Sequence, residues 1–93
     1  MRRYDEAIDV RRGLISGQEA PTQFLWRDRL WVVRDIVSHW IETGAWWEQT
    51  GADLLDEVEI WRVEARRGRE NTGVFDLAFD WALGQWHLVR CAD

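Results

Sequence analysis

Apolar and polar side chains alternate with a period of two through the last third of the chain, over residues 60–66, 74–81 and 86–91. This period places successive side chains on opposite faces of a β-strand, so that each strand can bury one face. Short polar stretches separate the three segments, as is typical of tight turns. The pattern predicts a three-strand antiparallel meander, with Trp81 and Trp86 side by side across a four-residue turn.

The first third of the chain carries weaker signals. Residues 7–10 predict a short strand, with Ile8 and Val10 on one face. Residues 13–22 predict a loop, because they contain two glycines and the only proline, Pro21.

Residues 24–33 consist of two β-rich runs around the polar pair Asp28-Arg29, which is a β-hairpin signal. With a two-residue turn, Trp26 lies opposite Trp31. With a three-residue turn, the register moves and Trp31 changes face. Asp tolerates the left-handed conformation moderately and Arg poorly, so the pattern leaves both registers open.

Residues 35–43 fit two structures. Ile36, Val37, Trp40 and Ile41 fall on one helical stripe, and a glycine follows at a position that could end a helix. Three of these four residues are β-branched, however, and β-branched and aromatic side chains favour strands. The sequence therefore leaves two predictions open for these residues, an extended, bent strand and a short helix.

Together these elements predict one small domain over residues 1–93. We expect an all-β fold, with one short helix if residues 35–43 are helical. Five or six short strands in an antiparallel meander suggest a small barrel or a rolled sheet.

Eight tryptophans stand in only 93 residues, and each can bury about 150–250 Å² of surface. Trp61, Trp81 and Trp86 alternate with Phe and Leu on well-defined strands, so we expect them in the core. We also expect Trp26 in the core. Whether Trp31 faces the core depends on the length of the hairpin turn.

The remaining rings, Trp40, Trp46 and Trp47, are candidates for the surface. Adjacent residues on a strand face opposite ways, so one of Trp46 and Trp47 points outward unless a bend buries both. With Leu54 and Leu55 nearby, these rings predict a docking patch for a protein partner, since Trp is typical of interface anchors.

The net charge is −5, and all 12 basic residues are arginines. An acidic chain is disfavoured as a general ligand of nucleic acid or acidic membrane, because phosphate neutralisation needs a basic surface. An alternative is a single-stranded nucleic-acid binder, in which bases stack on tryptophan and Arg62, Arg66, Arg67 and Arg69 follow the backbone.

The sequence has no arrangement of His, Ser or Cys residues that is typical of a catalytic or metal site. His39 and His87 have no His or Cys ligands at metal-binding spacing, and Ser38 and His39 are adjacent, so on a strand they point apart. The single cysteine, Cys91, permits no internal disulfide. We therefore expect no enzyme, metal or cofactor; a small-ligand pocket inside the barrel is a further alternative.

No apolar run approaches the roughly 20 residues that span a bilayer. No apolar stretch follows the N-terminal arginines, as it would in a secretory signal. We expect a cytoplasmic protein that does not bind membranes.

The whole chain resembles an uncharacterised actinobacterial family of small proteins, a domain of unknown function. The segments that carry the resemblance are 3–10, 24–29, 40–47, 61–64 and 84–89. Where many relatives have glycine in the first hairpin turn, this chain has Asp28.

The second half also resembles the C-terminal tail of ImuB-type proteins, which are inactive relatives of Y-family translesion polymerases. Residues 40–47, 60–64 and 84–88 follow the order of that tail, although an extra Ala45 separates Gly44 from the tryptophan pair. The resemblance implies partner binding in damage-tolerant DNA replication, without catalysis. It also favours a strand over 40–47.

Overall fold

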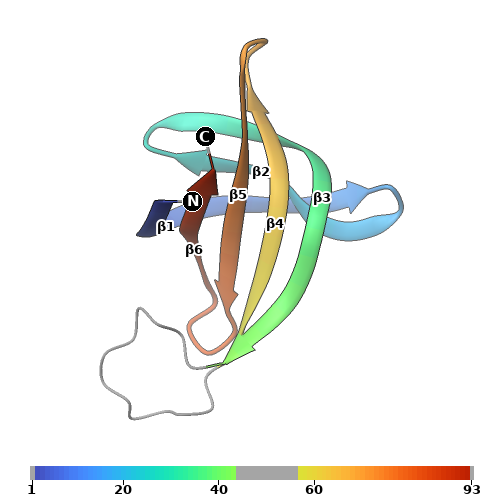
Figure 1. Ribbon diagram of the computed structural model, residues 1–93. Helices are drawn as coiled ribbons and strands as arrows, with labels where there is room; N and C mark the ends of the chain where they lie inside the picture. Colours follow the sequence, from blue (N-terminus) through green and yellow to red (C-terminus); the bar gives the residue numbers. More distant parts are fainter. Residues whose placement is uncertain (1, 44–56, 93) are drawn as a thin grey trace.

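The computed structural model describes residues 2–43 and 57–92, which form six β-strands (Figure 1). They are β1 (Arg2–Ile15), β2 (Gln18–Trp26), β3 (Arg29–Thr43), β4 (Glu57–Arg67), β5 (Asn71–Asp80) and β6 (Gln85–Ala92). Each strand pairs antiparallel with the next in sequence, and β6 returns to β1, so the sheet closes into a barrel. The predicted all-β meander, in its barrel form, is confirmed.

The interior is filled by side chains from all six strands. The period-two pattern of β4 and β5 turns Trp61, Val63, Phe75 and Leu77 inward, and all four are buried. Aromatic rings pack edge to face in this core; the Phe24 and Phe75 centroids, for example, lie 5.2 Å apart at 69°.

The prediction of a loop over residues 13–22 is wrong. These residues extend β1 and β2 around a tight turn at Ser16-Gly17, where both φ angles are positive. Pro21 is accommodated because the β1–β2 register shifts beside it, and proline is tolerated in strands at such bulges. The hydroxyl of Thr22 donates a hydrogen bond of 3.0 Å to a β1 carbonyl at this point.

The β2–β3 turn consists of Arg27 and Asp28, one residue earlier than predicted. Their φ angles of 53° and 62° are left-handed, as in the two-residue hairpin turns that match strand twist. Phe24 therefore lies opposite Trp31, which points inward and stacks near it. Arg27 is held in this conformation by Glu6, with contacts of 3.1 and 2.7 Å between its guanidinium and the carboxylate.

Residues 35–43 are extended and belong to β3, so the strand interpretation is confirmed and the helix is wrong. The register with β4 shifts twice, between Val33 and Asp35 and between Ile36 and Ser38. Each shift is a bulge that adds local bend and twist. Bends of this kind let one long strand pair with both β2 and β4.

Trp81 is 60% exposed, so its predicted place in the core is wrong. The turn begins at Trp81, and Phe79 is the residue that pairs with Trp86. Asp80 fixes the turn at this position: its carboxylate accepts backbone hydrogen bonds from Ala82 and Leu83 at 2.9 and 3.2 Å. Alternation in the sequence therefore continues one residue past the end of β5.

Candidate functional site

Of the five residues of the predicted docking patch, the structure describes Trp40. Trp40 lies on the outer face of β3, half-buried against a cluster of Val58, Ile60, Ala78 and Val89. Its indole donates a hydrogen bond of 3.0 Å to Glu42. The other four predicted residues, Trp46, Trp47, Leu54 and Leu55, lie outside the described residues.

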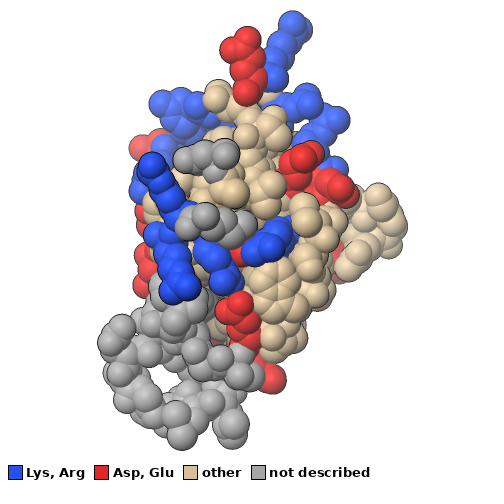
Figure 2. Space-filling model, viewed as in Figure 1, with Lys and Arg blue, Asp and Glu red and all other residues tan. Residues whose placement is uncertain are grey.

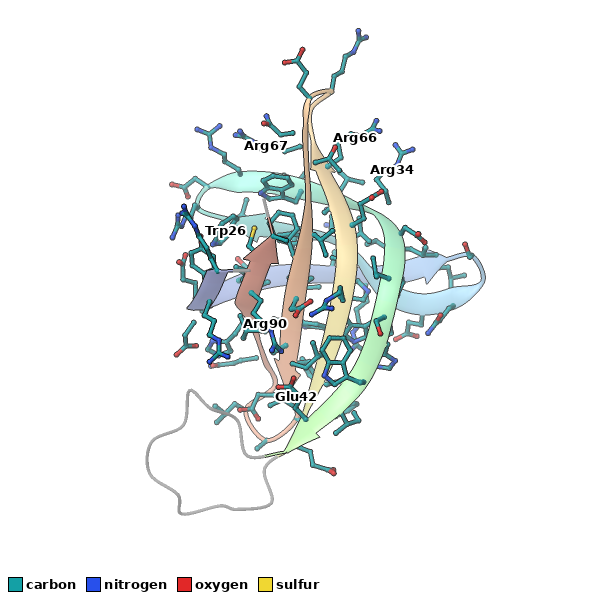
Figure 3. The ribbon with its side chains drawn as sticks, in the orientation of Figure 1. Trp26, Arg34, Glu42, Arg66, Arg67 and Arg90 are labelled. Atoms are coloured by element: carbon teal, nitrogen blue, oxygen red, sulfur yellow. The ribbon has the colours of Figure 1, made fainter. Side chains whose placement is uncertain are left out.

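Arg62, predicted as a nucleic-acid contact, is engaged within the protein. It donates to the two carboxylate oxygens of Asp76 at 2.8 and 2.9 Å, and its guanidinium lies over the Trp40 ring. Arg90 approaches the same buried Asp76 at 2.9 Å and also donates to Glu42 (Figure 3). The hydrogen bond to Asp76 raises the pKa of Arg62. This network ties β3, β4, β5 and β6 together on their outer face.

The three other predicted arginines do not share a face. Arg66 and Arg67 lie on opposite sides of the β4–β5 hairpin, as Figure 3 shows. Arg67 lies over the inward ring of Trp31, 5.7 Å from its centroid, whereas Arg69 is exposed in the turn. Figure 2 shows arginines across the top and along the left of the visible face, with acidic side chains among them. A single backbone track along Arg62, Arg66, Arg67 and Arg69 is therefore not formed.

The outer face of the β2–β3 hairpin carries three exposed aliphatic side chains, which we call the apolar strip. Leu25, Leu30 and Val32 are 41%, 49% and 46% exposed. Leu25 and Leu30 are direct cross-strand partners, and Val32 is two residues farther along the same face of β3. Contiguous exposed aliphatic residues are typical of binding surfaces, whereas isolated ones are common everywhere.

Charged residues border the apolar strip. One row of directly paired positions crosses four strands, from Arg11 on β1 through Gln23 and Val32 to Arg66 on β4. Both arginines are exposed, and neither forms an ion pair with another described residue. Asp9 stands in the neighbouring row, beside Leu25.

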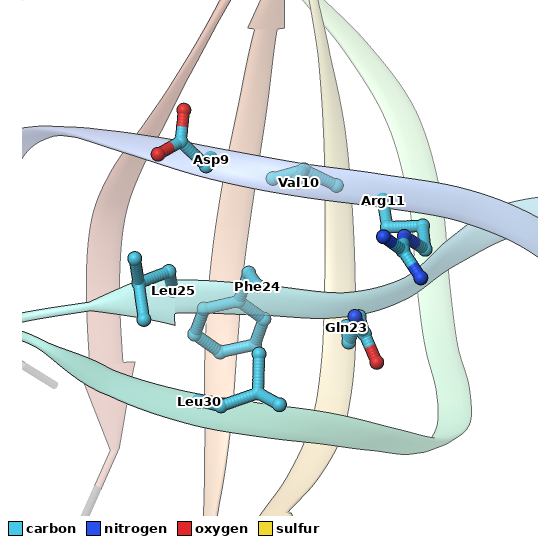
Figure 4. A pocket seen from close by; sticks show the side chains of 7 residues that line it. All are labelled: Asp9, Val10, Arg11, Gln23, Phe24, Leu25 and Leu30. Carbon is cyan, nitrogen blue, oxygen red and sulfur yellow. The ribbon is translucent and has the colours of Figure 1, made fainter.

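A hollow of about 290 Å³ opens at the apolar strip (Figure 4). Asp9 and Leu25 lie at one end of it and Arg11 and Gln23 at the other, with Leu30 between them. The hollow has an apolar centre, which includes Phe24, and one charged side chain at each end. Protein-binding surfaces commonly have such an apolar centre and polar rim.

A second group of polar side chains, formed by His39, Glu59 and Arg12, lies inside the barrel. His39 stacks on Trp61, with centroids 3.7 Å apart, and its Nε2 lies 2.5 Å from a carboxylate oxygen of Glu59. Arg12 lies 3.5 Å from the other oxygen and covers the rings of Phe79 and Trp86. Because these groups contact one another across three strands, we assign them to holding β1, β3 and β4 together.

A smaller hollow of about 220 Å³ opens beside Trp26, Trp31 and Phe75. The Trp26 wall is closed by Arg27, which lies 4.7 Å from the ring centroid and is neutralised by Glu6. The hollow is large enough for a single ring and smaller than common small-molecule sites.

Over residues 2–43 and 57–92 no helix has the length and apolarity that crossing a membrane requires, and no three His, Cys, Asp or Glu side chains are grouped to hold a metal ion. No curated protein and no solved structure matches the chain. Over residues 1–93 the chain matches the family described as Domain of unknown function (DUF6504), and it belongs to that family.

Proposed function

We propose that this chain is a non-enzymatic interaction module that binds a protein partner through the apolar strip. The observation that carries the proposal is the contiguity of Leu25, Leu30 and Val32 on the surface of a closed barrel. Protein interfaces commonly have an apolar centre and a polar rim, and the strip has this arrangement. A preformed surface also limits the entropy lost when the partner binds.

We further propose damage-tolerant DNA replication as its context, in an actinobacterial cytoplasm. The support is the resemblance to the tails of ImuB-type proteins. Segment 60–64 and the described part of segment 40–47, residues 40–43, lie on neighbouring strands, where Trp40 and Arg62 contact each other. The similar motif thus supplies part of the network that holds the outer face, and we assign partner contact to the apolar strip.

Single-stranded nucleic acid is the weaker alternative. Of the four arginines proposed for it, Arg62 is bound to Asp76 and Arg67 lies on Trp31. The net charge of −5 also opposes phosphate binding.

Site-specific photo-crosslinking tests the proposed function. A benzoylphenylalanine is placed at Leu30 in one variant and at Val37 in the control; both positions are aliphatic and about half exposed on β3. In cells with damaged DNA, the Leu30 variant should give a discrete protein adduct that the Val37 variant lacks. Adducts to nucleic acid alone, or the same adducts from both positions, would contradict the proposal.

A further inference from the structure

We infer that the free edge of β1, residues 9–15, accepts an extended segment of a protein partner as an added antiparallel strand. β1 pairs with β6 only as far as Ile8, but with β2 as far as Ile15. Among the described residues, this stretch therefore has a strand on one side only. Figure 1 shows the β1–β2 hairpin reaching past β3. The edge is separate from the apolar strip, so the inference goes beyond the proposed function.

The two hairpin turns show which backbone groups reach the free edge. In a hairpin with a two-residue turn, the residues that flank the turn exchange backbone hydrogen bonds, and bonded and non-bonded pairs then alternate. Counting from the β1–β2 turn, the backbone of Ile15 faces β2 and that of Leu14 faces the free edge. Counting from the β2–β3 turn, the backbone of Asp9 faces β2 and that of Val10 faces the free edge. An unpaired edge of this kind is a template for another strand.

Proline separates this edge from the other edge of the same hairpin. Pro21 lies on β2 before the pairing of β2 with β3 begins at Gln23, and proline has no N–H to offer a new strand. Residues 9–15 contain no proline. Of the two edges, that of β1 is therefore the one able to pair along its whole length.

A hollow lies where β1 leaves β6. Its volume is about 370 Å³, and its lining includes Val10 and Trp86. Directly opposed side chains of an antiparallel pair lie on the same face, about 5 Å apart. The residue of the partner opposite Val10 thus meets an apolar recess, which favours an aliphatic side chain.

Asp9 and Arg11 select the charged residues of the segment. Both are exposed on one face of β1, two residues apart, and neither makes an ion pair with another described residue. Opposite charges at directly opposed strand positions attract. In an antiparallel segment, an acidic residue therefore precedes a basic one by two positions, with the aliphatic residue between them.

The test uses the full chain labelled with ¹⁵N and the synthetic peptide Thr-Val-Thr-Val-Glu-Val-Lys, whose lysine lies opposite Asp9 in the proposed register. Amide hydrogen exchange is the readout. Val10 and Leu14 should become protected on binding, whereas Asp9 and Ile15 are already paired with β2 and should change little. Unchanged exchange at Val10 and Leu14 with millimolar peptide would overturn the inference.

Two N-methylated peptides test the backbone pairing. A methyl group on the nitrogen of the sixth residue, valine, faces the β1 edge and should weaken binding about tenfold, since it removes a backbone hydrogen bond. The same group on the fifth residue, glutamate, faces away from the edge and should leave binding nearly unchanged. Equal weakening by the two methyl groups would exclude strand addition.

Charge exchange tests the order of the charged residues. The peptide with glutamate and lysine exchanged should bind at least about twofold more weakly, since exposed pairs contribute up to about fivefold each. The double variant Asp9→Lys, Arg11→Glu should reverse this preference. The control Arg69→Glu, Glu70→Lys, which exchanges two exposed charges in the β4–β5 turn, should not. Equal binding of the two peptides would overturn the charge assignment.

The position of the bound peptide separates this inference from the proposed function. Amide chemical-shift changes confined to Leu25, Leu30 and Val32 would place the peptide on the apolar strip and overturn strand addition. Absence of the photo-crosslink from Leu30, with peptide bound at the β1 edge, would contradict the proposed function alone.

Discussion

Arg62 donates hydrogen bonds to both carboxylate oxygens of Asp76, whose side chain is completely buried on the outer side of the barrel wall. The buried carboxylate also lies 2.9 Å from Arg90 on the next strand. Asp76 is thus the counter-ion of two guanidinium groups that reach it from β4 and β6.

Replacing Asp76 with alanine should remove the buried carboxylate that both guanidinium groups contact, while Arg90 keeps its contact with Glu42. We expect the free energy of unfolding to fall by about 2 kcal/mol, less than for a fully buried pair because both arginines are partly exposed. Urea denaturation measures it. Asp9→Ala is the control, because Asp9 is exposed and should change stability by less than about 0.5 kcal/mol. Equal losses from the two variants would show that the network contributes little.

Acid should weaken the fold through Glu42 and Glu6. Burial raises the pKa of Glu42, but hydrogen bonds from Trp40 and Arg90 outweigh it, so this pKa lies below its ordinary value. The hydrogen bond from Arg27 lowers the pKa of Glu6. A lowered folded-state pKa gives stability that is present above the unfolded-state pKa and is lost as pH falls through the folded-state pKa.

Denaturant unfolding between pH 7 and pH 2 checks this expectation. Stability should decline below about pH 4, where free glutamate titrates, and the decline should be smaller in the Glu42→Gln variant. A variant with the same pH dependence as the parent would exclude Glu42 as a contributor.

The β2–β3 turn predicts opposite effects for two neighbouring glycine substitutions. Asp28→Gly should stabilise the protein by about 0.5 kcal/mol, because glycine adopts the observed positive φ without steric cost. Arg27→Gly should destabilise it, since the substitution removes the contacts with Glu6 and Trp26. Thermal melts measure the change in stability of each variant. A stabilised Arg27→Gly protein would show that those contacts are dispensable.

Trp61 and Trp81 should differ sharply on replacement by alanine. Trp61 is 3% exposed and Trp81 60%. Loss of the buried ring should cost about 3–5 kcal/mol and loss of the exposed ring less than about 1 kcal/mol. Chemical denaturation of the two variants gives both values, and comparable losses would place Trp81 in the core after all.

The alternating strands were predictable because their inward positions are consistently apolar, although Val58, Ile60, Ala78 and Val89 also bury part of the outer face. The end of β5 was not, because it depends on the backbone hydrogen bonds that Asp80 accepts, and alternation cannot reveal these. The extension of β1 and β2 through residues 13–22 was not predictable either. Pro21 argues against a strand there unless a bulge is known to lie beside it.

The apolar strip was not predictable from alternation. Leu25, Leu30 and Val32 lie in nearly continuous apolar runs, where a period of two does not reveal which face is outward. The placing of Arg11 and Arg66 in one row depends on the registers of three strand pairs. The bulge beside Pro21 and the turn at Arg27-Asp28 set the first two, and the β3–β4 register is separate from both. The outward face of this hairpin becomes visible only in the closed barrel.

The most direct test of the docking assignment compares Val32→Asp with Val37→Asp. Both valines are on β3 and about half exposed, but only Val32 belongs to the apolar strip. The protein captured through Leu30 is titrated against each variant by calorimetry, after thermal melts confirm that both are folded. We predict at least about a tenfold weaker Kd for Val32→Asp, because a carboxylate buried at an apolar contact costs more than about 1.4 kcal/mol, and a change below about twofold for Val37→Asp. Equal Kd values for the two variants would contradict the assignment of the partner to this surface.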